Sequence, residues 1–253
     1  MAATIISRVI GLLYRSPLGE TIGNEGLGYY STASNLYTIL LLISSYSIPM
    51  AVSKIVSERL ALKEYRNAHR VFHGALLYAV IVGGVAALVA FFGGKFLLPY
   101  NQQNALLALR VLAPTIFFSA VLGVLRGYFQ AHSTMMPTSI SQIIEQVFNA
   151  AFSIGAAWFF IQQFATNDTE HAKFGAAGGT LGTGAGVLAG LCFMVIVYGV
   201  NRKTILRKVA KDTRHREESY REIFQVLFLM VTPVIFTTFI YNCNAYLDNY
   251  LFF

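Results

Sequence analysis

The sequence is poor in charged residues. Aspartate, glutamate, lysine and arginine make up 12% of its 253 residues, whereas an average soluble protein carries roughly 25%. Hydrophobic residues make up 55%. A soluble fold of this length would need a charged surface that this composition does not supply. Soluble globular proteins are therefore excluded, and we expect a membrane protein.

Cysteine and catalytic motifs are scarce as well. Cys192 and Cys243 are the only cysteines and both fall in apolar stretches, which excludes a disulfide framework and a thiolate zinc site. His69 and His73 are spaced like two metal ligands on a helix, but without a third ligand we expect an exposed interfacial pair. The sequence also lacks a nucleophile elbow, a phosphate loop and suitably paired carboxylates. We therefore expect no enzyme, no cofactor and no bound metal.

What the sequence does contain is a series of long apolar runs with few or no charges. A helix needs roughly 18 to 20 such residues to cross the hydrocarbon core of a bilayer. The runs predict an all-α polytopic membrane protein with about seven transmembrane helices. They cover residues 4–21, 26–53, 74–94, 104–130, 146–167, 174–203 and 223–247.

The basic residues are sorted by side of the membrane. They gather between the second and third runs and between the sixth and seventh, in a predicted loop at 201–221, while the alternate connections contain few. By the positive-inside bias, we expect the N-terminus to be cytoplasmic and Lys54 to lie at the cytoplasmic interface of the membrane. The net charge of +7 then reflects topology and attraction to membrane lipids, not nucleic-acid binding.

Two features predict how the helices bend and pack. A proline inside a helix removes a backbone hydrogen bond and kinks the helix, and small residues at every fourth position let two helices approach closely. The prolines inside predicted spans are Pro17, Pro49, Pro114 and Pro233, and the glycine ladder comprises Gly178, Gly182, Gly186 and Gly190.

Arginines inside the spans are candidates for function, because a charge at a helix centre costs at least about 2.5–3.5 kcal/mol. Arg8 and Arg15 are seven residues apart and share one helix face with Gly11. Counted from residue 4, Arg15 lies about 16 Å deep. We expect it to line a cavity, with a structural ion pair as the alternative.

Arg110 and Arg126 belong to one span but point in opposite directions. Sixteen residues separate them, which is a rotation of about 160°. They cannot line the same cavity unless Pro114 re-aims the helix. We expect Arg126 to snorkel to the cytoplasmic interface and keep Arg110 as a cavity candidate.

Polar stripes on three spans predict a shared hydrophilic cavity, although polar contacts between helices explain some members. Gln142, Glu145 and Asn149 form one stripe, Asn35 belongs to a second, and Asp248 to a third. Glu145 is expected to pair with Arg15 or Arg8, or else to carry a proton. Glu145 and Asp248 are the candidates for ion coupling.

Three stretches resemble a known family. They are "SRVIGLLYRSPLGETIGNEGLGYY" (7–30), "IPMAVSKIVSE" (48–58) and "LRGYFQAHSTMMPTSISQIIEQ" (125–146). Together they resemble the polysaccharide-biosynthesis, oligosaccharide-flippase branch of the MOP (MATE-like) exporter superfamily, near the sporulation protein B-like proteins and the lipid II flippases. One departure is Ala131, where relatives often have glycine.

The resemblance implies about fourteen helices in two lobes around a central cavity that opens alternately to each side. Residues 1–221 would form the six-helix first lobe and residues 222–253 the opening helix of the second, so the chain would be a fragment of something longer. The implied substrate is an undecaprenyl-pyrophosphate-linked sugar. The "SR…G" pattern places Arg8 in register with a cavity arginine, and Arg15 is offset by one residue.

Three functions are compatible with these observations. The first is a flippase for a lipid-linked oligosaccharide or peptidoglycan precursor, serving cell-wall, spore-cortex or surface-polysaccharide synthesis. The second is a proton- or sodium-coupled multidrug exporter, and the third is a non-transporting scaffold for a glycan synthase partner. The predicted cavity residues are Arg8, Arg15, Asn35, Arg110, Gln142, Glu145 and Asn149.

Overall fold

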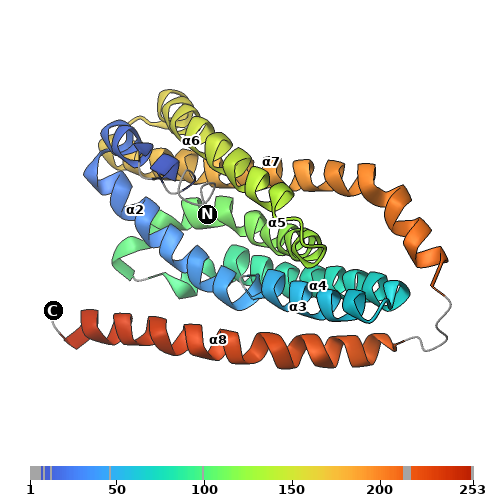
Figure 1. Ribbon diagram of the computed structural model, residues 1–253. Coiled ribbons are helices and arrows are strands. Elements are labelled where there is room, and N and C mark those ends of the chain that lie inside the picture. Colours follow the sequence, from blue (N-terminus) through green and yellow to red (C-terminus); the bar gives the residue numbers. More distant parts are fainter. Residues whose placement is uncertain are drawn as a thin grey trace.

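Every secondary-structure element in the described part of the chain is a helix, which confirms the all-α prediction (Figure 1). The computed structural model describes residues 7, 9–11, 13–45, 47–98, 100–212 and 218–251; its side-chain description omits 43, 101, 234, 235 and 238–251. The helices are α2 (Arg15–Ser44), α3 (Ile48–Ala61), α4 (Tyr65–Leu97), the 3-10 helix η1 (Tyr100–Ala105), α5 (Leu106–Ala131), α6 (Met136–Phe164), α7 (Asp168–Ala210) and α8 (Tyr220–Leu251).

Four helices among the described residues are long and apolar enough to cross a membrane. They correspond to the third to sixth of the seven predicted spans. The first predicted span begins in residues outside the described ones, and about half of the side chains of the seventh lie outside them too. The four helices cover Tyr65–Leu97, Gln102–Ala131, Met136–Phe164 and Asp168–Ala210.

The first two predicted spans are divided at a glycine. Gly23 lies inside α2 with φ 73° and ψ 173°, a left-handed conformation that glycine adopts without steric cost. The chain bends there, between the two predicted runs. The second run was expected to be one helix over 26–53, but α2 ends at Ser44 and α3 begins at Ile48. Pro49 therefore lies in the first turn of α3, where proline is tolerated, and it does not kink a span as predicted.

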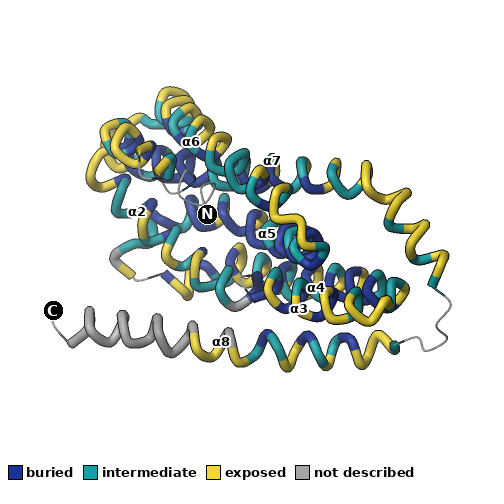
Figure 2. Tube along the Cα trace, viewed as in Figure 1, coloured by how far each residue is buried: buried dark blue, intermediate teal, exposed yellow. Residues whose placement is uncertain are grey.

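The glycine ladder brings α6 and α7 into close contact, as predicted. A Cβ atom added at Gly178 would lie 2.6 Å from the Cα atom of Ala157, so the two backbones nearly touch. Ser153 on α6 donates a hydrogen bond of 2.8 Å to the carbonyl oxygen of Gly179 on α7. Buried residues follow this seam while the outer face of α6 is exposed (Figure 2).

The predicted basic loop at 201–221 is mostly helical. Helix α7 continues to Ala210 and α8 already begins at Tyr220, because lysine and arginine favour helices and nothing breaks the helix earlier. At 43 residues, α7 is about 65 Å long, roughly twice the thickness of a hydrocarbon core. Its last turns therefore extend past the rest of the bundle (Figure 1).

Polar contacts fasten the start of α8 to α3 and α4. Arg59 forms an ion pair of 2.6 Å with Glu218, and Arg70 donates a hydrogen bond of 3.0 Å to the carbonyl oxygen of Glu218. The backbone N–H of Glu218 in turn donates to Asn67 over 3.2 Å. Helix α8 then runs alongside α3 and α4 (Figure 1), where Ile223 packs against Gly74.

Candidate functional site

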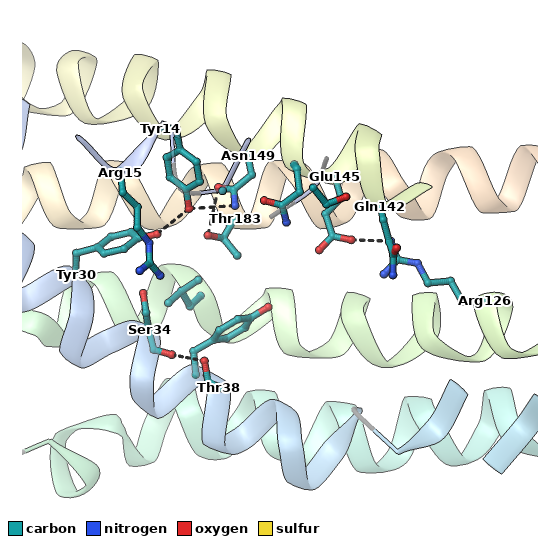
Figure 3. A pocket seen from close by; sticks show the side chains of 15 residues that line it. Tyr14, Arg15, Tyr30, Ser34, Thr38, Arg126, Gln142, Glu145, Asn149 and Thr183 are labelled. Atoms are coloured by element: carbon teal, nitrogen blue, oxygen red, sulfur yellow. Dashed lines mark hydrogen bonds and ion pairs between the residues drawn. The ribbon is translucent and has the colours of Figure 1, made fainter. Parts of the chain in front are cut away.

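A polar cavity of about 630 Å³ lies between α2, α5, α6 and α7. Most of the side chains around it carry a hydroxyl, an amide or a charge (Figure 3). Its lining comprises Ser7, Gly11, Tyr14, Arg15, Tyr30, Ser34, Tyr37, Thr38, Leu112, Arg126, Gln142, Glu145, Gln146, Asn149 and Thr183.

One end of the cavity combines a tyrosine–asparagine network with an open arginine. The hydroxyls of Tyr14 and Tyr30 are 3.3 Å apart, and Asn149 donates to Tyr14 over 3.4 Å. The side-chain oxygen of Asn149 accepts a hydrogen bond of 2.9 Å from Ser153. Arg15 lies beside this network (Figure 3) with its side chain exposed, and it makes no ion pair or hydrogen bond with any described residue. This end therefore offers a free guanidinium group.

The other end holds an ion pair between α5 and α6. Arg126 contacts Glu145 over 2.6 Å, with 15% and 22% of their side chains exposed. The Nε atom of Arg126 also donates to the hydroxyl of Ser141 over 2.9 Å, which itself donates to the carbonyl oxygen of Thr138 over 2.7 Å. The guanidinium is thus held by two residues of α6.

This pair corrects two predictions about charge. Arg126, expected to snorkel to the cytoplasmic interface, lines the polar cavity instead, and among the described residues the partner of Glu145 is Arg126 and not Arg15. The short turn between α5 and α6 places the last turns of one against the first turns of the other. Because a charge at this depth is far less costly when paired, the two side chains meet across the helix contact.

The structure brings Gln142, Glu145 and Asn149 together on the cavity wall, as their spacing predicts. It places Asn35 outside the cavity, exposed on α2, because its neighbours Ser34 and Thr38 occupy the inward face. The offset is a helical rotation of about 100° per residue.

Arg110 also lies outside the cavity. It is exposed, and its guanidinium carbon lies 5.8 Å from the centre of the Phe91 ring. The predicted opposition of Arg110 and Arg126 is therefore correct, but it is Arg126 that faces the cavity. Lys54 is exposed on α3, beside Gln130 at the end of α5.

Two predicted residues lie outside the description. Arg8 is not among the described residues, and the side chain of Asp248 is not described. In the described part of the chain, no three His, Cys, Asp or Glu side chains gather into a group that could hold a metal ion.

Sequence reasoning missed several lining residues. Tyr14, Tyr30 and Tyr37 are buried and read as apolar in a run of hydrophobic residues, although each carries a hydroxyl. Thr183 lies between glycines of α7, where the spacing of the glycines predicts helix packing and not a polar cavity wall. The signal that could have found them is their helical spacing: Tyr30, Ser34 and Tyr37 lie four and three residues apart on one face.

Helices long and apolar enough to cross a membrane, packed around a polar cavity with a guanidinium that has no partner among the described residues, define a multi-pass membrane protein with a polar internal cavity. The family is shown by the sequence as a whole. The chain belongs to the family described as polysaccharide biosynthesis protein, whose model matches residues 1–252.

Similar proteins occur in Bacillus subtilis (strain 168). The chain is 24% identical over 259 residues to the lipid II flippase MurJ, an alignment that covers 98% of the chain and 47% of the relative. It is 26% identical over 254 residues to stage V sporulation protein B, covering 98% and 46%. The chain thus spans less than half the length of these curated relatives.

Proposed function

We propose that the chain forms the first part of a flippase that moves a lipid-linked, diphosphate-bearing glycan precursor across the bacterial cytoplasmic membrane. The observation that carries this proposal is the free guanidinium of Arg15 on the wall of a polar cavity between membrane helices. The similarity to a lipid II flippase and to a sporulation protein over 98% of the chain supports it.

The chemistry of the cavity suits such a head group. A guanidinium binds phosphate oxygens through paired N–H donors, and Arg15 has no carboxylate partner among the described residues that would compete. The neighbouring tyrosine, asparagine and threonine side chains supply hydrogen-bonding groups for sugar hydroxyls. A volume of about 630 Å³ lies within the range typical of ligand sites. The lipid tail would stay in the bilayer.

The Arg126–Glu145 pair is the proposed coupling element of the cavity. Glu145 neutralises Arg126 at 2.6 Å. An arriving diphosphate competes with Glu145 for the guanidinium, and protonation of Glu145 or binding of a sodium ion would weaken the pair in the same way. Asp248 remains a second candidate for ion coupling.

The division of the chain is part of the same proposal. Residues 1–221 form the first lobe and residues 222–253 begin the second, with the N-terminus in the cytoplasm. The position of α8 supports the division, since its main contacts with the described bundle lie on α2, α3 and α4. The contacts of Glu218 with Arg59 and Arg70 would then join the two lobes at one point.

The test replaces Arg15 in the full-length protein. We expect Arg15→Ala to abolish complementation of a flippase-deficient strain and Arg15→Lys to retain part of it, because lysine keeps the charge but loses the paired donors. Lys54→Ala is the matched control, since Lys54 is a cation outside the cavity. Membrane levels are compared by immunoblot. Full complementation by a normally inserted Arg15→Ala protein would refute the role of this residue.

A multidrug exporter and a glycan-synthase scaffold are the alternatives. The described cavity carries two arginines against one glutamate, and this positive balance disfavours a cationic drug as cargo. A scaffold would tolerate alanine at Arg15 and at Glu145 but not changes in the 201–221 segment, so an alanine scan of both regions separates it from a transporter.

A further inference from the structure

An apolar groove of about 430 Å³ lies between α4 and α5, away from the polar cavity. All of its lining residues are apolar. Some are small, such as Gly84, Ala87 and Ala113, and others are bulky, such as Phe91 and Phe117. The groove opens on the outside of the bundle, because Phe91 is exposed and Gly84 has no atom within 4 Å of a Cβ position.

The groove follows from how the two helices touch. They meet closely at Gly83, where an added Cβ would lie 2.7 Å from the Cβ of Ala120, and again at Gly94, at 3.0 Å from Leu106 and Leu109. Between these two points the small residues Gly84, Ala87 and Ala113 leave space between the helices, which the bulky residues beside them do not fill. The hollow is therefore built into the sequence of α4 and α5.

The cation nearest to the lining of this groove is Arg110, which contacts Phe91. Arg110 lies in the first turns of α5, with its guanidinium carbon 5.8 Å from the centre of the Phe91 ring. It is exposed and has no carboxylate partner among the described residues. Leu112 faces the polar cavity, and Arg110, two residues earlier, points about 160° away from it. Arg110 therefore lies on the outer face of α5, which points away from the polar cavity.

We propose that this groove binds one anionic phospholipid, with its phosphodiester on Arg110 and one acyl chain along the apolar lining. The distance from Phe91 to Gly84 along α4 is about 10 Å and runs from the end of the helix towards its middle, the direction that an acyl chain takes from its head group. Arginine binds phosphate oxygens in pairs, and the exposed Lys95 in the last turn of α4 adds positive charge at the same end. The site does not depend on what the polar cavity carries.

The charge of Arg110 favours a phospholipid over a protein helix as the occupant of the groove. A helix of a partner or of a second lobe would bury Arg110 against apolar side chains unless it brought a carboxylate, at a high desolvation cost. A phospholipid supplies the anion and the chain in one molecule, at the height where the bilayer already holds both. The occupant is therefore an anionic phospholipid.

The test measures phospholipid retention on the purified, delipidated full-length protein by native mass spectrometry. Phosphatidylglycerol is compared with phosphatidylcholine of the same acyl chains. We expect the wild type to retain one phosphatidylglycerol in preference. Arg110→Gln should weaken this retention about tenfold, the factor for losing a charge-assisted hydrogen bond. Gly84→Leu, placed in open space, should reduce retention of both lipids by filling the groove.

Arg207→Gln is the control, because Arg207 is an exposed arginine near the end of α7, far from α4 in sequence. Equal retention by wild type, Arg110→Gln and Gly84→Leu would overturn the proposal, as would equal retention of the two phospholipids. A preference for undecaprenyl phosphate over phosphatidylglycerol would assign the groove to a transported lipid tail and also overturn it. Arg110→Gln should still complement the flippase-deficient strain, so this test and the Arg15 test can fail separately.

Discussion

The close contact of α6 and α7 gives a quantitative prediction at Gly178. A Cβ atom added there would lie 2.6 Å from the backbone N and Cα atoms of Ala157 and 2.5 Å from the carbonyl oxygen of Ala156. Ordinary contacts begin at 3.4 Å, so the backbones would have to separate by about 0.8 Å. Such a shift would also stretch the hydrogen bond from Ser153 to the carbonyl oxygen of Gly179.

Gly178→Ala should therefore destabilise the bundle, and the matched control is Gly199→Ala. Gly199 lies on the same helix with no atom within 4 Å of a Cβ position. Both variants gain about 1 kcal/mol of helix propensity, so their difference isolates the packing cost. Overpacking a close contact costs about 1–3 kcal/mol, which lowers the melting temperature by several degrees.

The assay is thermal unfolding in detergent micelles. It can be followed by the fluorescence of Trp158, the only tryptophan of the chain, which adjoins Ala157 in the contact. We expect Gly178→Ala to melt below wild type and Gly199→Ala to melt at or above it. Equal melting temperatures for the two variants would refute the argument that α6 and α7 depend on glycine at this seam.

Two further predictions concern ion pairs. Arg126→Met and Glu145→Gln should each lower the free energy of unfolding by about 1–3 kcal/mol, because each single change leaves the partner side chain without its ion pair. The double variant should therefore lose less stability than the sum of the two single variants. Additive effects would contradict the 2.6 Å pair. Arg59→Ala should increase deuterium uptake at the start of α8, since it removes the 2.6 Å contact with Glu218, whereas Lys54→Ala should not. Equal uptake by the two variants would show that the Arg59–Glu218 contact does not hold the start of α8.

Much of the architecture could be read from local sequence. The charge-poor runs gave α4, α5, α6 and α7, because a membrane helix must satisfy its own backbone and needs only length and apolar side chains. The glycine spacing in 178–190 predicted that a neighbouring helix approaches α7 closely, although not which helix it is, and the polar stripe of α6 predicted which of its faces lines the cavity. Each of these properties depends on neighbours within one or two helical turns.

The partners of individual charges could not be read in this way. Arg126 sits near a predicted membrane edge, where snorkelling was the simpler interpretation, and the expected partners of Glu145 were Arg15 and Arg8. Choosing among them requires the rotation of α5 against α6, to within less than a quarter turn. The rotations of α2, α5 and α7 within the bundle likewise place Asn35 and Arg110 on the outside and Tyr30 and Thr183 on the inside.

The sequence by itself thus determined that this protein crosses a membrane as helices and that one of these helices carries a glycine face for close packing. It also determined that arginine and glutamate side chains lie at membrane depth. Only the tertiary structure decided that Glu145 holds Arg126, that Arg15 is left without a partner among the described residues, and that Arg110 faces away from the cavity. The physical reason is that helical periodicity fixes angles within one helix, whereas the packing of side chains between helices fixes the angle of each helix towards its neighbours.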